Sequence, residues 1–209
     1  MSEARPSRIA LYVVSVLGTY VVLLLSTSGY TESTTRAAVR ITAQIGVVLF
    51  CAAFMAAPLL QLARGRIGAW LLTRRRQLGI SFGVTHALHI LALAALAISF
   101  PDPFVSELDA VTLIGGGIAS ALIFAMALTS SDAAQRAIGM RGWKRLHGVG
   151  SYFAWFVFAG SYFPRAAGDA SYVPFALLLA GTLGLRIARA SARRLTTHRG
   201  HTRDGVVAP

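Results

Sequence analysis

Six apolar runs, each about as long as a bilayer is thick, constrain this chain more than any other feature of its sequence. They cover residues 9–26, 41–63, 78–100, 111–128, 146–163 and 172–187. A transmembrane helix needs about 20 mainly apolar residues, and each run comes close to that length. We therefore predict an all-α integral membrane protein, a six-transmembrane-helix bundle that occupies residues 1–190.

The composition supports a membrane protein and excludes a nucleic-acid-binding one. Of the 209 residues, 55% are hydrophobic and 13% are charged, which lies outside the range of ordinary soluble domains. The net charge of +12 comes from basic residues that punctuate the apolar runs, whereas a nucleic-acid reader gathers them on one solvated face. We expect the lipid bilayer as a partner and no nucleic acid. The single cysteine, Cys51, lies in an apolar run and is expected to be buried.

The distribution of positive charge predicts the orientation of the helices. If the N-terminus is cytoplasmic, all but three of the 20 lysines and arginines fall in cytoplasmic segments; the exceptions are Arg36, Arg40 and Arg165. Cytoplasmic loops carry such an excess in multi-pass membrane proteins. We predict both termini on the cytoplasmic side of a bacterial-type inner (plasma) membrane, with a basic, disordered tail at 191–209. The arginine-rich segment 64–76 is predicted to be a short interfacial helix.

Three histidines, His86, His89 and His147, lie within or at the edge of the predicted spans, and no Asp or Glu lies within any span. Ionisable residues at membrane depth indicate a functional site. Imidazole is the strong ligand type available there, and ligation of haem iron by two imidazoles is a common use of it. His86 and His89 share one helix face, so both cannot bind one iron from opposite sides. The alternative is that these histidines join helices by hydrogen bonds.

Two ordered stretches around these histidines are similar to a known family. RRQLGISFGVTHALH at 75–89 opens the third span, and ALTSSDAAQRAIGMRGWKRLHGVGSYFAWFVF at 127–158 joins the fourth span to the fifth. Over residues 35–165 the chain resembles the ferric reductase-like transmembrane domain family, and within it the MsrQ (YedZ)-type haem b membrane subunits. The outer spans and the tail match only by topology.

The resemblance implies a haem b protein that carries electrons across or within the membrane. The donor would be a quinol or a soluble flavin-containing reductase, and the acceptor a periplasmic or membrane oxidoreductase, in the MsrQ-type branch a molybdenum-containing methionine sulfoxide reductase. The implied cofactor is haem b, and a quinone or FMN follows by resemblance alone. Such a subunit is an oxidoreductase only together with a partner protein, and the resemblance assigns it no catalytic residue.

The resemblance also assigns ligand positions, and one of them is changed here. His89 falls on the third-span ligand of the family and His147 on its first fifth-span histidine, whereas the second fifth-span histidine is replaced by Gly160. His86 is an additional histidine. At about 1.5 Å per residue, His89 lies roughly 20 Å from Arg76, which matches position 160 in depth better than it matches His147.

Three arrangements are compatible with this pattern. A haem is held by His86 or His89 with another partner, for which Met126, Tyr152 and Tyr162 are candidates. Alternatively, the fifth span begins well before Trp143, so that His147 is deep enough to pair with His86. In the third arrangement haem is five-coordinate or absent, and the protein is a haem-free membrane scaffold or assembly subunit that keeps the fold. His86, His89 and His147 are therefore the predicted cofactor-binding and iron-ligating residues.

Overall fold

The computed structural model describes residues 8–106 and 109–204, and these residues form helices without any strand. The elements in chain order are α1 (Arg8–Ser28), α2 (Glu32–Ala63), α3 (Arg66–Ser99), α4 (Pro101–Ser106), α5 (Ala110–Leu128), α6 (Asp132–Gly168), the 3₁₀ turn η1 (Ala170–Tyr172) and α7 (Val173–Asp204). The predicted all-α class is thereby confirmed for the described part of the chain.

Five segments are long and apolar enough to cross a membrane. They are Ile9–Ser28, Glu32–Ala63, Arg66–Ser99, Ala110–Leu128 and Ala170–Arg193. Helix α6, which contains the fifth predicted span, is not among them, because its glycine, serine, tyrosine and histidine residues dilute the apolar ones. A helical protein with several membrane-crossing helices is thus supported, whereas the sixth span and the orientation of the termini stay predictions.

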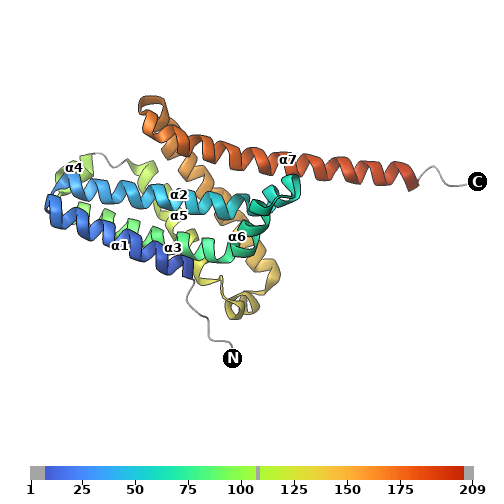
Figure 1. The fold of residues 1–209 in the computed structure, drawn as a ribbon, viewed down its shortest axis with the longest axis horizontal. Helices are drawn as coiled ribbons and strands as arrows, with labels where there is room; N and C mark the ends of the chain where they lie inside the picture. The colour runs from blue at the N-terminus through green and yellow to red at the C-terminus, as the bar shows by residue number, and fades with distance from the viewer. Residues whose placement is uncertain (1–7, 107–108, 205–209) are drawn as a thin grey trace, which may run out of the picture.

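The helices pack around α2, which contacts α1, α3 and α7. Figure 1 shows α1, α2 and α3 side by side, with α7 running across the bundle and beyond it. Helix α5 packs against α3 and α6, and α6 packs against α7. At the centre, the ring of Phe50 lies 5.1 Å from that of Phe54, 5.4 Å from Phe82 and 5.3 Å from Phe158. This aromatic cluster joins α2, α3 and α6.

Two glycines bring neighbouring helices close to α5. A β-carbon added to Gly83 of α3 would lie 2.7 Å from the Ala127 side chain, and one added to Gly150 of α6 would lie 2.8 Å from the Met126 sulfur. Any larger residue would push the helices apart, since real β-carbons do not approach other atoms so closely. The same turn of α5 therefore contacts both α3 and α6.

The arginine-rich segment at 64–76 does not form a separate interfacial helix. Helix α2 ends at Arg64, whose φ of 48° is left-handed and whose N–H donates to the Leu60 carbonyl, and α3 starts two residues later. Gly68 permits this tight reversal, because a β-carbon there would lie 2.7 Å from the Leu60 backbone. The segment is the first part of α3, packed against the end of α2, and so it is held by the helix pair.

Two further helices differ from a regular rod. Gly139 interrupts α6 with a φ of 72°, so the part that carries His147 begins at Met140. Pro58 lies inside α2 and lacks an N–H, which leaves the Phe54 carbonyl without its usual partner four residues later. Arg186 of α7 donates to that carbonyl at 3.2 Å. The chain thus repairs the defect in α2 from a distant helix.

Helix α7 continues to Asp204 and so includes most of the segment predicted as a tail. The side chains from residue 194 onward, including both tail histidines, lie outside the described residues, as do residues 205–209.

Candidate cofactor site

A cavity of about 380 Å³ lies between α2, α3, α5 and α6, and His147 is one of its walls. Its apolar lining includes Phe50, Phe54, Phe82, Ile123, Met126, Ala127 and Trp143. Its polar lining includes Arg75, Arg76, Ser130, Asp132, Gln135 and Ser151. Ligand pockets are commonly 300 Å³ or more in volume, mainly apolar, with a few polar groups. The cavity has that character. Its imidazole could bind a metal, and its two guanidinium groups are cations.

His147 is held in place by two neighbours. Its ring stacks on Trp143 with centroids 4.2 Å apart, and its Nε2 lies 3.3 Å from the Thr129 hydroxyl. Because that hydroxyl already donates to the Ala125 carbonyl at 2.7 Å, the imidazole is the donor in this pair. The bond is long, so Nε2 could exchange it for a stronger ligand at small loss.

His86 faces α5 and does not line the cavity. Its Nε2 lies 2.9 Å from the Ser120 hydroxyl, which itself donates to the Gly116 carbonyl. The imidazole is therefore again the donor, and the bond is short. Its ring also packs against Phe82 and Phe124. This arrangement joins α3 to α5, as the hydrogen-bonding alternative predicts, and it occupies the nitrogen that would bind iron.

His89 faces α2 and has the opposite arrangement. Its Nδ1 lies 3.1 Å from the Val39 carbonyl and 3.2 Å from the Thr42 hydroxyl. A carbonyl only accepts, so Nδ1 carries the proton and Nε2 keeps its lone pair. Metal-ligating histidines commonly donate their other ring N–H to a backbone carbonyl in this way. His89 thus has the tautomer of a ligand, although it does not line the cavity described above.

The structure does not bring the three histidines together around one metal. His147 contacts Thr129 and His86 contacts Ser120, and these α5 residues lie nine apart, roughly 13 Å along a helix. Two imidazoles bound to one metal at about 2 Å each leave their nitrogens only about 4 Å apart. The His86–His147 pair is therefore not supported. The rings of His86 and His89 lie 5.8 Å apart on the same helix and cannot face each other across a cofactor.

Two contacts between helices indicate which residues of α6 lie at the same depth in the bundle as His89 of α3. Gly83 of α3 and Gly150 of α6 contact the same turn of α5 and so lie at the same depth. His89 is six residues after Gly83, and the residue six after Gly150 is Phe156, so the first contact places His89 level with Phe156. Phe82 contacts Phe158, and counting seven residues puts His89 level with Arg165. Position 160 lies between these limits, which are about 13 Å apart along the helix. Gly160 is exposed, and a β-carbon on it would meet no atom within 4 Å because it faces the outside of the bundle.

Among the other candidates, only Met126 lines the cavity with His147. Its sulfur lies 3.8 Å from the Ser151 hydroxyl. Tyr152 accepts a hydrogen bond from Arg186, and Tyr162 is buried against Tyr172 and Phe175. The sequence did not single out Thr129 or Ser151, although Thr129 belongs to the Leu-Thr-Ser motif that closes the fourth span.

The residues of the cavity fit a haem. The macrocycle needs apolar and aromatic walls, its iron needs an imidazole, and its carboxylates need cations. Phenylalanines and Trp143 provide the walls, His147 the imidazole, and Arg75 a cation, whereas Arg76 is paired with Asp132 at 2.8 Å. A second imidazole is lacking, so the cavity fits a five-coordinate haem or one with a weaker ligand such as Met126.

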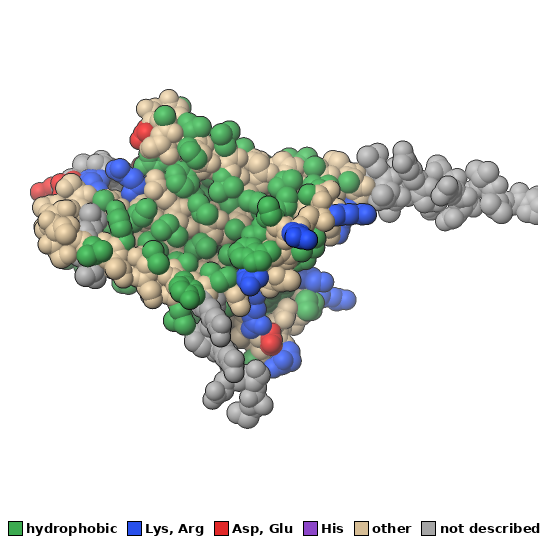
Figure 2. Space-filling model, in the orientation of Figure 1, with side chains coloured by type: hydrophobic (Ala, Val, Ile, Leu, Met, Phe, Trp, Pro, Cys, Tyr) green, Lys and Arg blue, Asp and Glu red, His purple; other side chains and the backbone are tan. Residues whose placement is uncertain are grey.

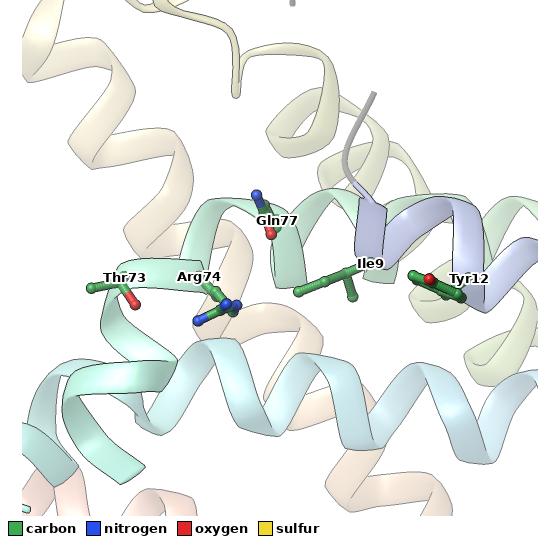
Figure 3. A pocket seen from close by; sticks show the side chains of 5 residues that line it. All are labelled: Ile9, Tyr12, Thr73, Arg74 and Gln77. Carbon is green, nitrogen blue, oxygen red and sulfur yellow. The ribbon is translucent and has the colours of Figure 1, made fainter. Parts of the chain in front are cut away.

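A second hollow, of about 400 Å³, lies between the start of α1 and α3. Figure 3 shows its five lining side chains, Ile9, Tyr12, Thr73, Arg74 and Gln77. It contains no histidine, and its polar groups are exposed side chains near a helix end. It is therefore a poorer candidate for a cofactor.

The fold and the site together define a class of protein but no family. In the described residues, no group of three or more histidine, cysteine or acidic residues could hold a metal ion by itself. The chain matches no family model, no curated protein and no solved structure. By its structure it is a helical protein with several apolar helices of membrane-crossing length and a partly open cavity between four helices that is lined by an imidazole.

Proposed function

We propose that this protein is a membrane haem b electron-transfer subunit of the ferric reductase-like type. The observation that carries the proposal is the position of His147 on the wall of an apolar cavity beside Arg75 and Arg76. The resemblance in sequence independently selects His147 and His89 as ligands. The tautomer of His89, set by the Val39 carbonyl, agrees with that selection.

The residues of the chain would divide the work as follows. His147 would hold the iron through Nε2 in place of its long bond to Thr129, with the ring proton carried on Nδ1, and its stacking on Trp143 would keep the ring oriented. Arg75 offsets the negative charge of the carboxylates. The aromatic walls exclude water. His89 is the candidate ligand at a second level, and His86 serves as a joint between α3 and α5.

Haem, when bound, accepts and returns single electrons without movement of the protein around it. The sequence carries no glycine-rich nucleotide fingerprint, so the electrons would come from a quinol or a soluble flavin reductase and go to a periplasmic or membrane acceptor. Arg75 and Arg76 lie just before the apolar part of α3, which would place the cavity near the cytoplasmic face, within reach of a soluble donor.

A dithionite-reduced minus oxidised spectrum of the purified protein, expressed with ample haem, tests the proposal. We expect b-type bands. His147→Ala should remove most of the absorbance, His89→Ala should remove part or all of what remains, and His86→Ala should leave it nearly unchanged because Nε2 of His86 is bound to Ser120.

Thr129→Val is the matched control, since it removes the partner of His147 without removing the imidazole. It should retain haem. An absence of b-type bands in the wild type would refute the proposal and favour the haem-free scaffold. Equal haem content in the three histidine variants would refute the ligand assignment.

A further inference from the structure

Three arginines meet at one end of the bundle although they come from two helices far apart in sequence. Arg75 of α3 donates from Nε to the Ala53 carbonyl at 3.2 Å, and Arg186 of α7 donates to the Phe54 carbonyl at 3.2 Å. These acceptors are consecutive residues of α2. The positive charges of Arg186 and Arg189 both act on Arg75. Arg75, Arg186 and Arg189 are called the arginine cluster below.

No carboxylate balances the arginine cluster. Among the described residues, Asp132 is the acidic side chain at this end of the bundle, and it pairs with Arg76 at 2.8 Å. None of the three clustered guanidinium groups forms an ion pair in the described parts of the chain. Figure 2 shows most of the visible blue side chains gathered at the end of the bundle from which the C-terminal part of α7 extends, with little red among them. The cluster therefore carries uncompensated positive charge.

The cluster also holds buried donors that lack an acceptor. The Nε atoms of Arg186 and Arg189 are buried and have no hydrogen-bond partner. The guanidinium carbon of Arg186 lies 3.5 Å from the centroid of the Phe54 ring and 5.1 Å from that of Tyr152, which fixes its plane. A buried donor without an acceptor costs free energy, and the loss is larger when the donor is charged. An oxygen-rich anion beside the cluster would offset the repulsion between the guanidinium groups.

We propose that the arginine cluster binds a phosphate group, supplied by the headgroup of an acidic phospholipid. Guanidinium groups bind phosphate with planar, charge-assisted hydrogen bonds. Basic pockets between transmembrane helices on the cytoplasmic side are known positions for acidic headgroups. The cluster lies where the apolar parts of α3 and α7 give way to arginine-rich segments, which is where a headgroup would lie, and it contacts α2 about ten residues before that helix ends. Snorkelling accounts for one arginine at a helix end but leaves the two unpartnered Nε atoms unexplained.

This inference goes beyond the proposed electron-transfer function and does not depend on it. Arg189 is the residue to change, because it does not line the cavity and does not cap the Phe54 carbonyl. In the full-length detergent-solubilised protein, native mass spectrometry would measure the dissociation constants of dioleoylphosphatidylglycerol and dioleoylphosphatidylcholine. We expect the wild type to bind phosphatidylglycerol at least about tenfold more tightly, a typical effect of one charge-assisted bond. Arg189→Gln should remove that preference.

Arg74→Gln is the matched control. The Arg74→Gln change removes the same charge at the same end of the bundle as Arg189→Gln. The guanidinium of Arg74 lies over the Trp70 ring, however, and is not part of the cluster. The control should keep the preference for phosphatidylglycerol. Equal binding of the two lipids by the wild type, or an unchanged preference in Arg189→Gln, would overturn the proposal.

Two further measurements identify the source of the phosphate. If inorganic phosphate raises the melting temperature in phosphatidylcholine nanodiscs as much as phosphatidylglycerol does, the ligand is free phosphate and the assignment to a lipid is wrong. The spectrum of Arg189→Gln provides the second check. A loss of haem absorbance in that variant would show that Arg189 serves the haem carboxylates together with Arg75, and the proposal would fail.

Discussion

The cavity beside His147 and the face of α3 that carries His86 and His89 divide between them the properties that a haem site needs. The cavity provides about 380 Å³ of space with aromatic walls, but Nε2 of its histidine is bound to Thr129. On α3, His89 keeps a free Nε2, but it does not line that cavity. The cavity and the free Nε2 lone pair of His89 therefore lie at different depths in the bundle.

This comparison shows that the hydrogen-bond partner of a histidine determines which of its ring nitrogens is free to bind a metal, even for two histidines on the same face of a helix. His86 and His89 are one turn apart, yet one donates from Nε2 and the other from Nδ1. The acceptor sets the tautomer in each case: a serine hydroxyl on α5 for His86, and a backbone carbonyl on α2 for His89. The following predictions alter one region while leaving the other intact.

The largest expected effect comes from filling the cavity. Gly79 lines it, and a β-carbon on Gly79 would meet no atom within 4 Å, so Gly79→Phe can enter the space without a clash at its base. We expect haem content to fall more than about tenfold, which corresponds to about 1.4 kcal/mol of binding. The reduced-minus-oxidised spectrum, normalised to protein, measures this effect.

Gly115→Phe is the control for this change. Gly115 of α5 also has open space around it but does not line the cavity. Haem content should be unchanged. A similar loss in both variants would mean that the haem lies elsewhere or that the substitutions act through the fold.

A second variant adds a second imidazole on α6 as a possible partner for His89. Gly160→His would place an imidazole on α6 near the level of His89, at a position with no atom in the way. We expect the haem-to-protein ratio to rise by up to about twofold, because His89 already has its Nε2 free for coordination. The pyridine haemochrome assay measures the ratio.

The gain should disappear when Gly160→His is combined with His89→Ala, and it should survive in combination with His86→Ala. If Gly160→His binds no additional haem, or if His86→Ala abolishes the gain, the assignment of His89 as the ligand at this level would be wrong.

A smaller effect is expected at the joint between α3 and α5. Ser120→Ala removes the acceptor of His86 and should lower the free energy of unfolding by about 0.6 kcal/mol, the average for such bonds in membranes. Haem content should not change. A double-mutant cycle with His86→Leu isolates the pair, and a coupling energy near zero would show that the bond contributes nothing to stability.

The smallest expected effect is on the pH dependence of stability, and it comes from the residue that caps the N-terminus of α5. Asp109 caps this helix by accepting from the Thr112 N–H and hydroxyl, both at 2.7 Å, and these bonds hold the pKa of Asp109 below its usual value of 3.8. A lowered pKa means that the stabilisation is complete above about pH 3.8 and is lost as the pH falls further through the pKa of the folded state.

Asp109→Asn keeps an acceptor at the cap but cannot titrate. The melting temperature of the variant should therefore depend less on pH below about 3.8 than that of the wild type. Identical pH profiles would show that the cap does not contribute to this dependence.

The apolar runs were sufficient to predict the helices but not their exact extent. The run at 41–63 ends at Ala63 in the structure, as predicted, because Arg64 takes a left-handed conformation there. The start of α3 was missed by twelve residues, since an arginine-rich segment reads as interfacial when its packing against the end of α2 is unknown. Close approach at Gly68 is a tertiary contact that no local pattern reveals.

Of the three candidate histidines only His147 lines the cavity, and the sequence could not give the geometry around any of them. The three histidines could be chosen from sequence because few ionisable groups lie in the apolar runs. Their hydrogen-bond partners could not be chosen, since Val39 and Ser120 lie far from them in the chain. The roles of Thr129 and of the arginine cluster likewise arise only when α5, α6 and α7 come together.

The bond from Arg186 to the Phe54 carbonyl has a consequence for how the protein is made. The two residues are 132 positions apart, so α2 leaves the ribosome long before its partner on α7 exists. At roughly 5–20 residues per second, the delay is on the order of ten seconds. During that time the broken backbone pairing next to Pro58 must be shielded by water, lipid headgroups or the insertion machinery. Helix α7 thus completes a segment synthesised much earlier, and a chain truncated before it would leave α2 poorly anchored at that depth.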